Sequence, residues 1–447
     1  MTPLVPLVMF GWIPAVLVMF TVLPARRAVL AAFVGAWLFL PMAGYSLPGL
    51  PDYTKVSATS IAAVLGAAIF DGGRLAAFRL RLIDLPMVTW CVVPVATSLS
   101  NGLGLHDGVS SAVGQVCTWG IPYFLGRLYL SDWEAMREAA LAIVIGALCY
   151  LPLCLIEVRL SPQLHRWVYG YHVHQFVQSK RLGGFRPTVF MQHGLAVGMW
   201  MCMGAMLAMW GWRTKLWLEV MRVPASWVAA SLVMIAVLVK SVGALALLVG
   251  AIGGLIVSRT MKTRAVLAAL LLVPLVYIGV RTMGVWHGEG VIEAARLVSE
   301  SHSGSFKFRL ENEELLLDRA RDRPILGWGG WGRSRVLDEE GNDAAVTDGF
   351  WVIAFGEHGV IGLAALMGGL LAPGAVVVMR LPRGWERHGG IVAATGLAVL
   401  MGMYGIDCLM NAMANPVFMV AAGGVANAGM MLKRVRSAGA GSGMRVA

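Results

Sequence analysis

The feature that most constrains this chain is a succession of long apolar stretches, which runs from its first residues almost to its end. Each stretch has about 17 to 25 residues, the length that a helix needs to cross a hydrocarbon core of about 30 Å. The stretches begin near Leu4, Val29, Val56, Ile83, Val109, Ala139, Val189, Pro224, Ser241, Ala265, Phe350, Gly390 and Pro416. The pattern predicts an all-α, polytopic membrane protein with about 12 to 13 transmembrane helices.

The overall composition agrees with this fold class. Hydrophobic residues make up 58% of the 447 residues. A soluble protein could not bury so many in one core, because too few charged residues remain for its surface. In lipid, all backbone hydrogen bonds must be made within the protein, by helices or by a closed barrel. The stretches are continuously apolar and lack the in-out alternation of barrel strands, which favours helices. We expect a single membrane domain over residues 1–447.

The basic residues predict the orientation of the chain, because Lys and Arg in short loops stay on the cytoplasmic side. They occupy every second loop, so all these loops can lie on one side of the membrane. The loops carry Arg26 and Arg27; Arg74, Arg79 and Arg81; Arg127 and Arg137; Arg213, Lys215 and Arg222; Arg259, Lys262 and Arg264; and Arg380, Arg383 and Arg387. The net charge of +11 is then a topological signal, and we expect no nucleic-acid binding. Thirteen helices would leave the N-terminus outside and the C-terminus in the cytoplasm.

The same topology puts two long loops, residues 158–189 and 282–349, on the outer face. The second loop has helix-forming composition over residues 308–319, with Arg309 and Glu313 spaced to share one helix face. This predicts an amphipathic helix lying on the outer membrane surface. After it, prolines and glycines break the helix around Trp328 and Trp331. These rings are candidates for stacking on a sugar, although Trp is also common at membrane interfaces.

Cations near the outer face are the other candidate site residues. Arg186 directly precedes a helix, and its planar guanidinium suits phosphate oxygens, unless it simply snorkels to solvent. Lys240 stands between two apolar stretches with almost no loop around it, so the chain either turns there or keeps the Lys in a re-entrant element. His172 and His174 form no complete ligand set, so no metal is expected.

Three motifs give the chain a resemblance to a known family. They are Arg323-Pro324-Ile325-Leu326-Gly327-Trp328-Gly329, Lys240-Ser241-Val242-Gly243-Ala244-Leu245, and Asp348-Gly349 followed by Gly359-Val360-Ile361-Gly362. In this order the chain resembles the O-antigen ligase and polysaccharide polymerase family of bacterial envelope enzymes. The second half carries the motifs, while the first half resembles the family only in its hydrophobic layout. The chain departs from the family at two places, since Asp348 replaces the motif histidine and Val242 replaces the arginine of a Ser-Arg-Gly turn.

The resemblance implies a membrane glycosyltransferase of the inner, cytoplasmic membrane. It would move a glycan from a polyprenyl-pyrophosphate donor to a glycan or lipid acceptor on the outer face. Asp348 would serve as the base, and burial or a neighbouring carboxylate such as Asp343 would raise its pKa. Arg186, Lys240 and Arg309 would bind the donor pyrophosphate, with no metal and no cofactor. His358 lies about three helical turns deeper and is a poor substitute for the missing histidine.

Other interpretations remain open from the sequence. The chain could be a transporter or flippase of lipid-linked glycan, or a non-catalytic assembly partner that kept the scaffold. The motifs do not choose between ligase and polymerase. Asp348 could also be only a helix cap, and Gly359 and Gly362 only close-packing positions.

Overall fold

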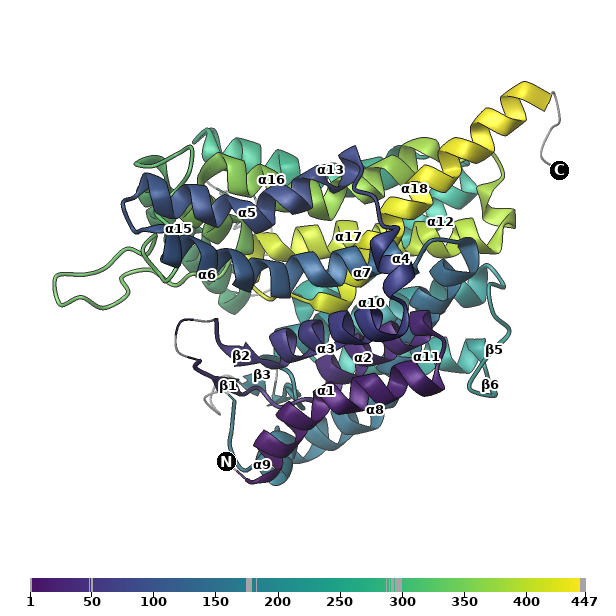
Figure 1. Ribbon diagram of the computed structural model, residues 1–447, viewed down its shortest axis with the longest axis horizontal. Helices are drawn as coiled ribbons and strands as arrows, with labels where there is room; N and C mark the ends of the chain where they lie inside the picture. The colour runs from purple at the N-terminus through teal and green to yellow at the C-terminus, as the bar shows by residue number, and fades with distance from the viewer. Residues whose placement is uncertain are drawn as a thin grey trace.

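The structure is a computed structural model that describes residues 2–47, 49, 51–173, 179–181, 183–286, 288, 290, 293 and 300–442. These residues form a bundle of long helices with short two-stranded hairpins at its ends (Figure 1). The predicted all-α, polytopic membrane fold is confirmed. In this part of the chain, nine helices are long and apolar enough to cross a membrane, and Lys55–Phe70 and Ala225–Leu238 are shorter apolar helices.

Every predicted apolar stretch contains a helix. The helices of the first half are α1 (Leu4–Val22), α2 (Ala25–Phe39), α3 (Lys55–Phe70), α4 (Gly72–Ala76), η1 (Leu82–Asp84), α5 (Leu85–Ser100), α6 (Leu105–Gln115), η2 (Val116–Gly120), α7 (Ile121–Tyr129), α8 (Trp133–Leu160), α9 (Leu164–Tyr169) and α10 (Gly194–Arg213). Those of the second half are α11 (Ala225–Leu238), α12 (Val242–Thr260), α13 (Ala265–Thr282), α15 (Glu300–Arg321), α16 (Phe350–Arg380), η4 (Trp385–Arg387), α17 (Gly389–Met410) and α18 (Pro416–Ser442). The antiparallel hairpins pair β1 (Gly44–Tyr45) with β2 (Tyr53–Thr54), β3 (Lys180–Arg181) with β4 (Gly184–Phe185), and β5 (Glu219–Val220) with β6 (Val223–Pro224).

Burial separates central helices from peripheral ones. Most of α10, α17 and α18 is buried, whereas at most a third of α1, α12 and α13 is buried. Helix α16 packs against α5, α17 and α18, and small residues allow close approach in this group. At Gly126 and Gly423, a β-carbon would collide with the backbone of the facing helix, α18 or α7. Exposed apolar side chains on the outer helices are what a lipid-facing surface requires.

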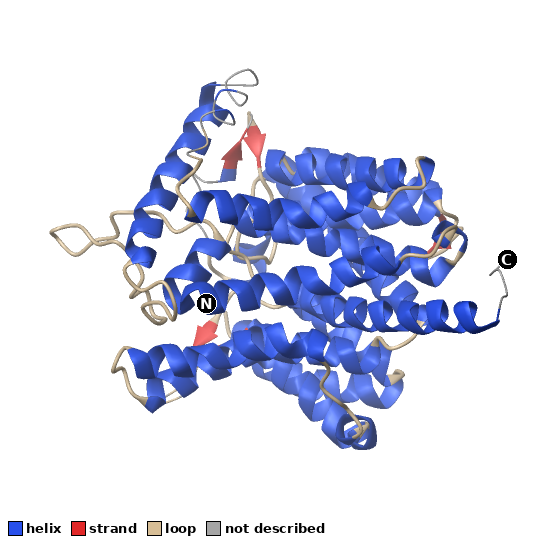
Figure 2. Cartoon of the chain, turned by 90° about the horizontal axis from the view of Figure 1, so that it is seen from above, coloured by secondary structure: helices blue, strands red, loops and turns tan. Residues whose placement is uncertain are grey.

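The long loops and the basic loops lie at opposite ends of the bundle. Hairpins β1–β2 and β3–β4, the N-terminus, α9 and α15 gather at one end, which we call the loop end (Figures 1 and 2). The predicted basic loops meet at the opposite end, which we call the basic end. Ion pairs there link helices, among them Arg26 with Asp132 at 3.1 Å and buried Arg127 with Asp84 at 2.6 Å. The expected separation of the two kinds of loop is therefore present in the fold.

Candidate functional site

The candidate site is centred on Asp348, which lies just before α16 at the loop end. Its carboxylate Oδ2 lies 3.4 Å from Nε of Arg309 on α15, and both side chains are partly exposed. Arg309 also donates from Nη1 to the carbonyl oxygen of Met410 at the end of α17, at 3.4 Å. A small pocket lined by Arg309, Asp348, Gly349 and Met410 lies at this junction. The structure therefore brings together the proposed base and one of the proposed cations.

The surroundings of Asp348 shift its pKa in two directions. Burial raises the pKa of the carboxyl above its ordinary value, and the charge of Arg309 opposes this rise. The neighbouring carboxylate that we expected to help is elsewhere, because Asp343 pairs with Arg335 at 2.7 Å. Of the two causes that the sequence suggested, burial is the one that raises this pKa, and Asp343 does not contribute.

Asp348 does not occupy the cap position of α16. The N-cap residue is Gly349, which has no side chain to offer, and the helix begins at Phe350. The carboxylate is turned toward Arg309 instead. Its position is thus compatible with a role beyond helix capping.

The other two predicted cations, Arg186 and Lys240, meet at the same end of the bundle. Nη2 of Arg186 donates to the backbone carbonyl of Lys240 at 3.1 Å. Burial, together with the charges of Arg181 and Arg309, lowers the pKa of Arg186 to about 10. The guanidinium of Arg186 still carries its charge at neutral pH, and this charge interacts with that of Arg309. A phosphate bound here would interact favourably with the guanidinium of Arg186.

The chain turns at Lys240, so the re-entrant interpretation is wrong. Helix α11 ends at Leu238, α12 begins at Val242, and Lys240 takes a left-handed conformation with φ of 57°. Hairpin β3–β4 packs against this turn, and Nζ of Lys240 lies against Gly184. The first long loop and the turn of Lys240 therefore form one surface.

The two candidate sugar-contact tryptophans have different surroundings. The guanidinium carbon of Arg319 lies 3.4 Å from the ring centroid of Trp328, that of Arg323 lies 4.4 Å away, and the indole N–H donates to the carbonyl of Arg319 at 2.7 Å. Trp331 is 66% exposed in a turn with φ of 61°. Trp328 is thus held by cation–π contacts, while the ring of Trp331 is accessible to a ligand.

Two of the resemblance motifs are hydrogen-bonded to each other. Helix α16 breaks at Gly359, where φ is 62° and ψ is −164°, and the loop of residues 324–329 fits against the break. The backbone N–H of Val360 donates to Pro324 at 2.7 Å, and those of Trp328 and Gly329 donate to Gly356 and Glu357 at 2.9 Å. Any side chain at Gly359 would collide with the backbone of Ile325. Gly359 is therefore a close-packing position, but against a loop and at a helix break, and not between two membrane helices.

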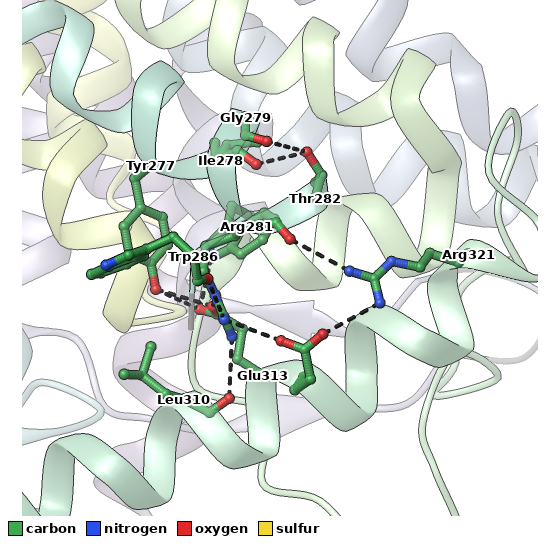
Figure 3. A network of polar contacts seen from close by, with 11 residues as sticks. Tyr277, Ile278, Gly279, Arg281, Thr282, Trp286, Leu310, Glu313 and Arg321 are labelled. Atoms are coloured by element: carbon green, nitrogen blue, oxygen red, sulfur yellow. Dashed lines mark hydrogen bonds and ion pairs between the residues drawn. The ribbon is translucent and has the colours of Figure 1, made fainter. Parts of the chain in front are cut away.

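A buried polar network, which the sequence did not predict, fixes α15 to the bundle (Figure 3). Glu313 pairs with Nε of Arg281 at 2.6 Å and accepts from the Tyr277 hydroxyl at 3.0 Å and from the Trp351 indole at 3.2 Å. Arg281 is 1% exposed and also donates to the carbonyl of Leu310 at 3.2 Å. Burial raises the pKa of Glu313, and Arg281 opposes this rise. Arg309 and Glu313 were expected on one face, yet each binds a different partner.

The helix expected over 308–319 is confirmed, and it extends over Glu300–Arg321. It lies across the loop end of the bundle (Figure 2), and its own side chains Leu310, Leu316 and Leu317 are buried. Because it also buries Asn312 and Glu313, it is docked on protein and not only on an apolar stripe. The one signal for this in the sequence is an arginine, Arg281, inside the last turn of an apolar stretch.

No described histidine lines the pocket around Asp348. His358 is buried inside α16, where its ring nitrogen lies 3.4 Å from the Thr97 hydroxyl. His174 lies outside the described residues. Among the residues that the structure describes, no group of three His, Cys, Asp or Glu side chains is arranged to hold a metal ion.

No protein family model matches this chain, and a search of curated proteins finds no match either.

Proposed function

We propose that the chain is a membrane glycosyltransferase of envelope polysaccharide assembly, a ligase or polymerase similar to the O-antigen ligases. It would transfer a glycan from a polyprenyl-pyrophosphate donor to an acceptor hydroxyl. The observation that carries the proposal is the pairing of Asp348 with Arg309 at the loop end of the bundle. Arg186, whose guanidinium donates to the backbone carbonyl of Lys240, lies within electrostatic reach of Arg309 at the same end.

In this reaction the acceptor oxygen attacks the anomeric carbon, and the bond from that carbon to the pyrophosphate oxygen breaks. The acceptor proton goes to the Asp348 carboxylate, whose raised pKa suits a general base. The leaving pyrophosphate takes the electron pair and develops negative charge. Arg186, Lys240 and Arg309 would stabilise that charge without a metal or cofactor.

The proposal also assigns an orientation. The basic end would face the cytoplasm of a bacterium and the loop end the outer side of its inner membrane, in line with the positive-inside rule. The N-terminus would then lie outside, and α18 would carry the C-terminus into the cytoplasm. The donor and acceptor would meet on the outer face, next to membrane lipids.

The test is a size profile of lipid-linked and surface glycans in cells with the normal chain, a deletion, or Asp348→Asn at equal protein level. Deletion and Asp348→Asn should both accumulate lipid-linked glycan and lose the attached or long product. Glu340→Gln, an exposed carboxylate of the same loop, is the matched control and should behave normally. Normal product from Asp348→Asn would remove Asp348 from the reaction, and a protein that moves labelled lipid without changing its glycan would be a flippase.

A further inference from the structure

A large groove lies at the basic end, away from the candidate site, and it is open to the surroundings of the bundle. It has a volume of about 980 Å³ and is formed by the segment that enters α5, by the end of α16 and by the exit of α18. It forms because Gly429 of α18 packs directly on Val376 of α16, after which α18 continues out of the bundle (Figure 1).

The rim of this groove is positively charged. Its lining contains the cations Arg81, Arg380, Lys433 and Arg434 and the single carboxylate Asp84. That carboxylate is buried and already neutralised by Arg127, whose Nε lies 2.6 Å from it. Its negative charge therefore does not balance the rim, and the groove has a net attraction for anions.

The walls of the groove are apolar. Leu80, Leu82 and Leu85 are 62%, 89% and 58% exposed, an arrangement that water alone would disfavour. Arg79 and Arg81 alternate with these leucines in the segment before η1. Such a segment can insert leucines into lipid while its arginines extend toward head groups. Val88, Val376 and Ala426 continue the apolar lining toward the middle of the bundle.

We infer that this groove binds one anionic glycerophospholipid, with its phosphate among Arg81, Lys433 and Arg434 and an acyl chain along the apolar wall. Basic pockets between transmembrane helices, at the level where apolar helices end and basic loops begin, are sites for anionic lipid head groups. The same end carries the other basic loops, and at this groove an apolar wall of exposed leucines adjoins a basic rim. The inference does not depend on the proposed transferase activity.

The test is native mass spectrometry of the purified full chain in detergent, titrated with dioleoylphosphatidylglycerol, dioleoylphosphatidylcholine or inorganic phosphate. We expect one phosphatidylglycerol to bind at least about tenfold more tightly than phosphatidylcholine, because several cations act on its single charge. Inorganic phosphate should not compete at the same concentration, since it lacks the acyl chain. Equal binding of the two lipids, or effective competition by phosphate, would overturn the proposal.

Variants locate the site. The triple substitution Arg81→Gln, Lys433→Gln and Arg434→Gln should weaken phosphatidylglycerol binding about tenfold or more. Arg380 is kept because its Nη1 donates to the carbonyl of Gly429 at 2.9 Å and supports α18.

The matched control removes three charges elsewhere at the basic end, by Arg213→Gln, Arg222→Gln and Lys262→Gln, and should retain binding. Val88→Phe keeps every charge but fills the apolar wall, and it should also lose the lipid. Melting temperatures in phosphatidylcholine identify variants that fail to fold. Equal loss in the two triple variants would mean a general basic surface and no lipid site.

Discussion

Asp348 and Arg309 shift one pKa in opposite directions, and this gives the site a testable pH dependence. Burial raises the pKa of Asp348, while the nearby guanidinium lowers it. A base acts only when deprotonated, so transfer should rise as the pH rises through this pKa. At acid pH the carboxyl would be protonated and inactive.

Replacing Arg309 by Gln removes the positive charge that lowers the pKa of Asp348. The pKa, which burial raises, should therefore rise further. The acidic limb of the rate profile should move to higher pH, in addition to any loss of donor binding. The measurement is glycan transfer in membrane vesicles across a pH series. Lys307→Gln, on the exposed side of α15, should leave the limb unchanged. An unchanged limb in Arg309→Gln would show that Asp348 is not the titrating base.

The two tryptophans should separate stability from binding. Trp328→Ala loses two cation–π contacts and a hydrogen bond, and should destabilise the protein by about 1 to 3 kcal/mol. Trp331→Ala, at an exposed ring, should leave the melting temperature unchanged and raise the KM for the glycan. Thermal melting in detergent and initial rates measure the two effects. A normal KM in Trp331→Ala would exclude the sugar contact.

At the scale of elements, the break in α16 depends on a position, 359, whose backbone conformation and surroundings only glycine fits. Gly359→Ala forces a β-carbon into the backbone of Ile325 at positive φ, and should cost more than about 2 kcal/mol. The amide hydrogens in the loop of residues 324–329 should then exchange faster with solvent. Gly250→Ala in α12 is the control, because nothing lies near its β-carbon and alanine favours helix. Similar melting temperatures for the two variants would contradict this account.

Glu313 should be the residue that holds α15 in place. Glu313→Gln removes the buried charge partner of Arg281 Nε, so that only Glu314, 3.1 Å from Nη1, still pairs with this arginine, and should cost about 2 kcal/mol. Exchange of the α15 amides should accelerate, and transfer should fall because Arg309 leaves Asp348. The exposed pair Lys307 and Glu311 supplies the control, and Glu311→Gln should change stability by less than about 0.5 kcal/mol. Unchanged exchange in Glu313→Gln would mean that apolar packing alone docks α15.

Local patterns predicted the elements well, whereas contacts between distant residues were not predictable. Each apolar stretch became a helix, and the helix around 308–319 was found, because hydropathy and propensity act over neighbouring residues. The pairing of Arg281 with Glu313 joins positions far apart in the chain, and nothing in the sequence indicates which cation a given carboxylate will find. For the same reason the sequence did not indicate that Asp343 pairs with Arg335. The break at Gly359 resembles ordinary helix packing until the loop against it is known.

At the scale of the whole molecule, the separation of the two ends predicts an accessibility pattern. In a cysteine-free background, Glu340→Cys at the loop end should react with a membrane-impermeant maleimide in intact cells. Arg222→Cys at the basic end should react only after the membrane is opened. Both side chains are exposed, so burial cannot explain a difference. Labelling of Arg222→Cys in intact cells would reverse the proposed orientation.

Helix α11 is much shorter than its neighbours, and this has a consequence for the bilayer itself. Its residues Ala225–Leu238 rise by about 21 Å, well short of a hydrocarbon core of about 30 Å. Trp227, Met234 and Val237 nevertheless face outward. One response of a bilayer to such a short helix is local thinning of the leaflets beside it. Head groups and water would then lie closer to the turn at Lys240. A lipid phosphate could approach this side of the bundle laterally, without leaving the level of the head groups.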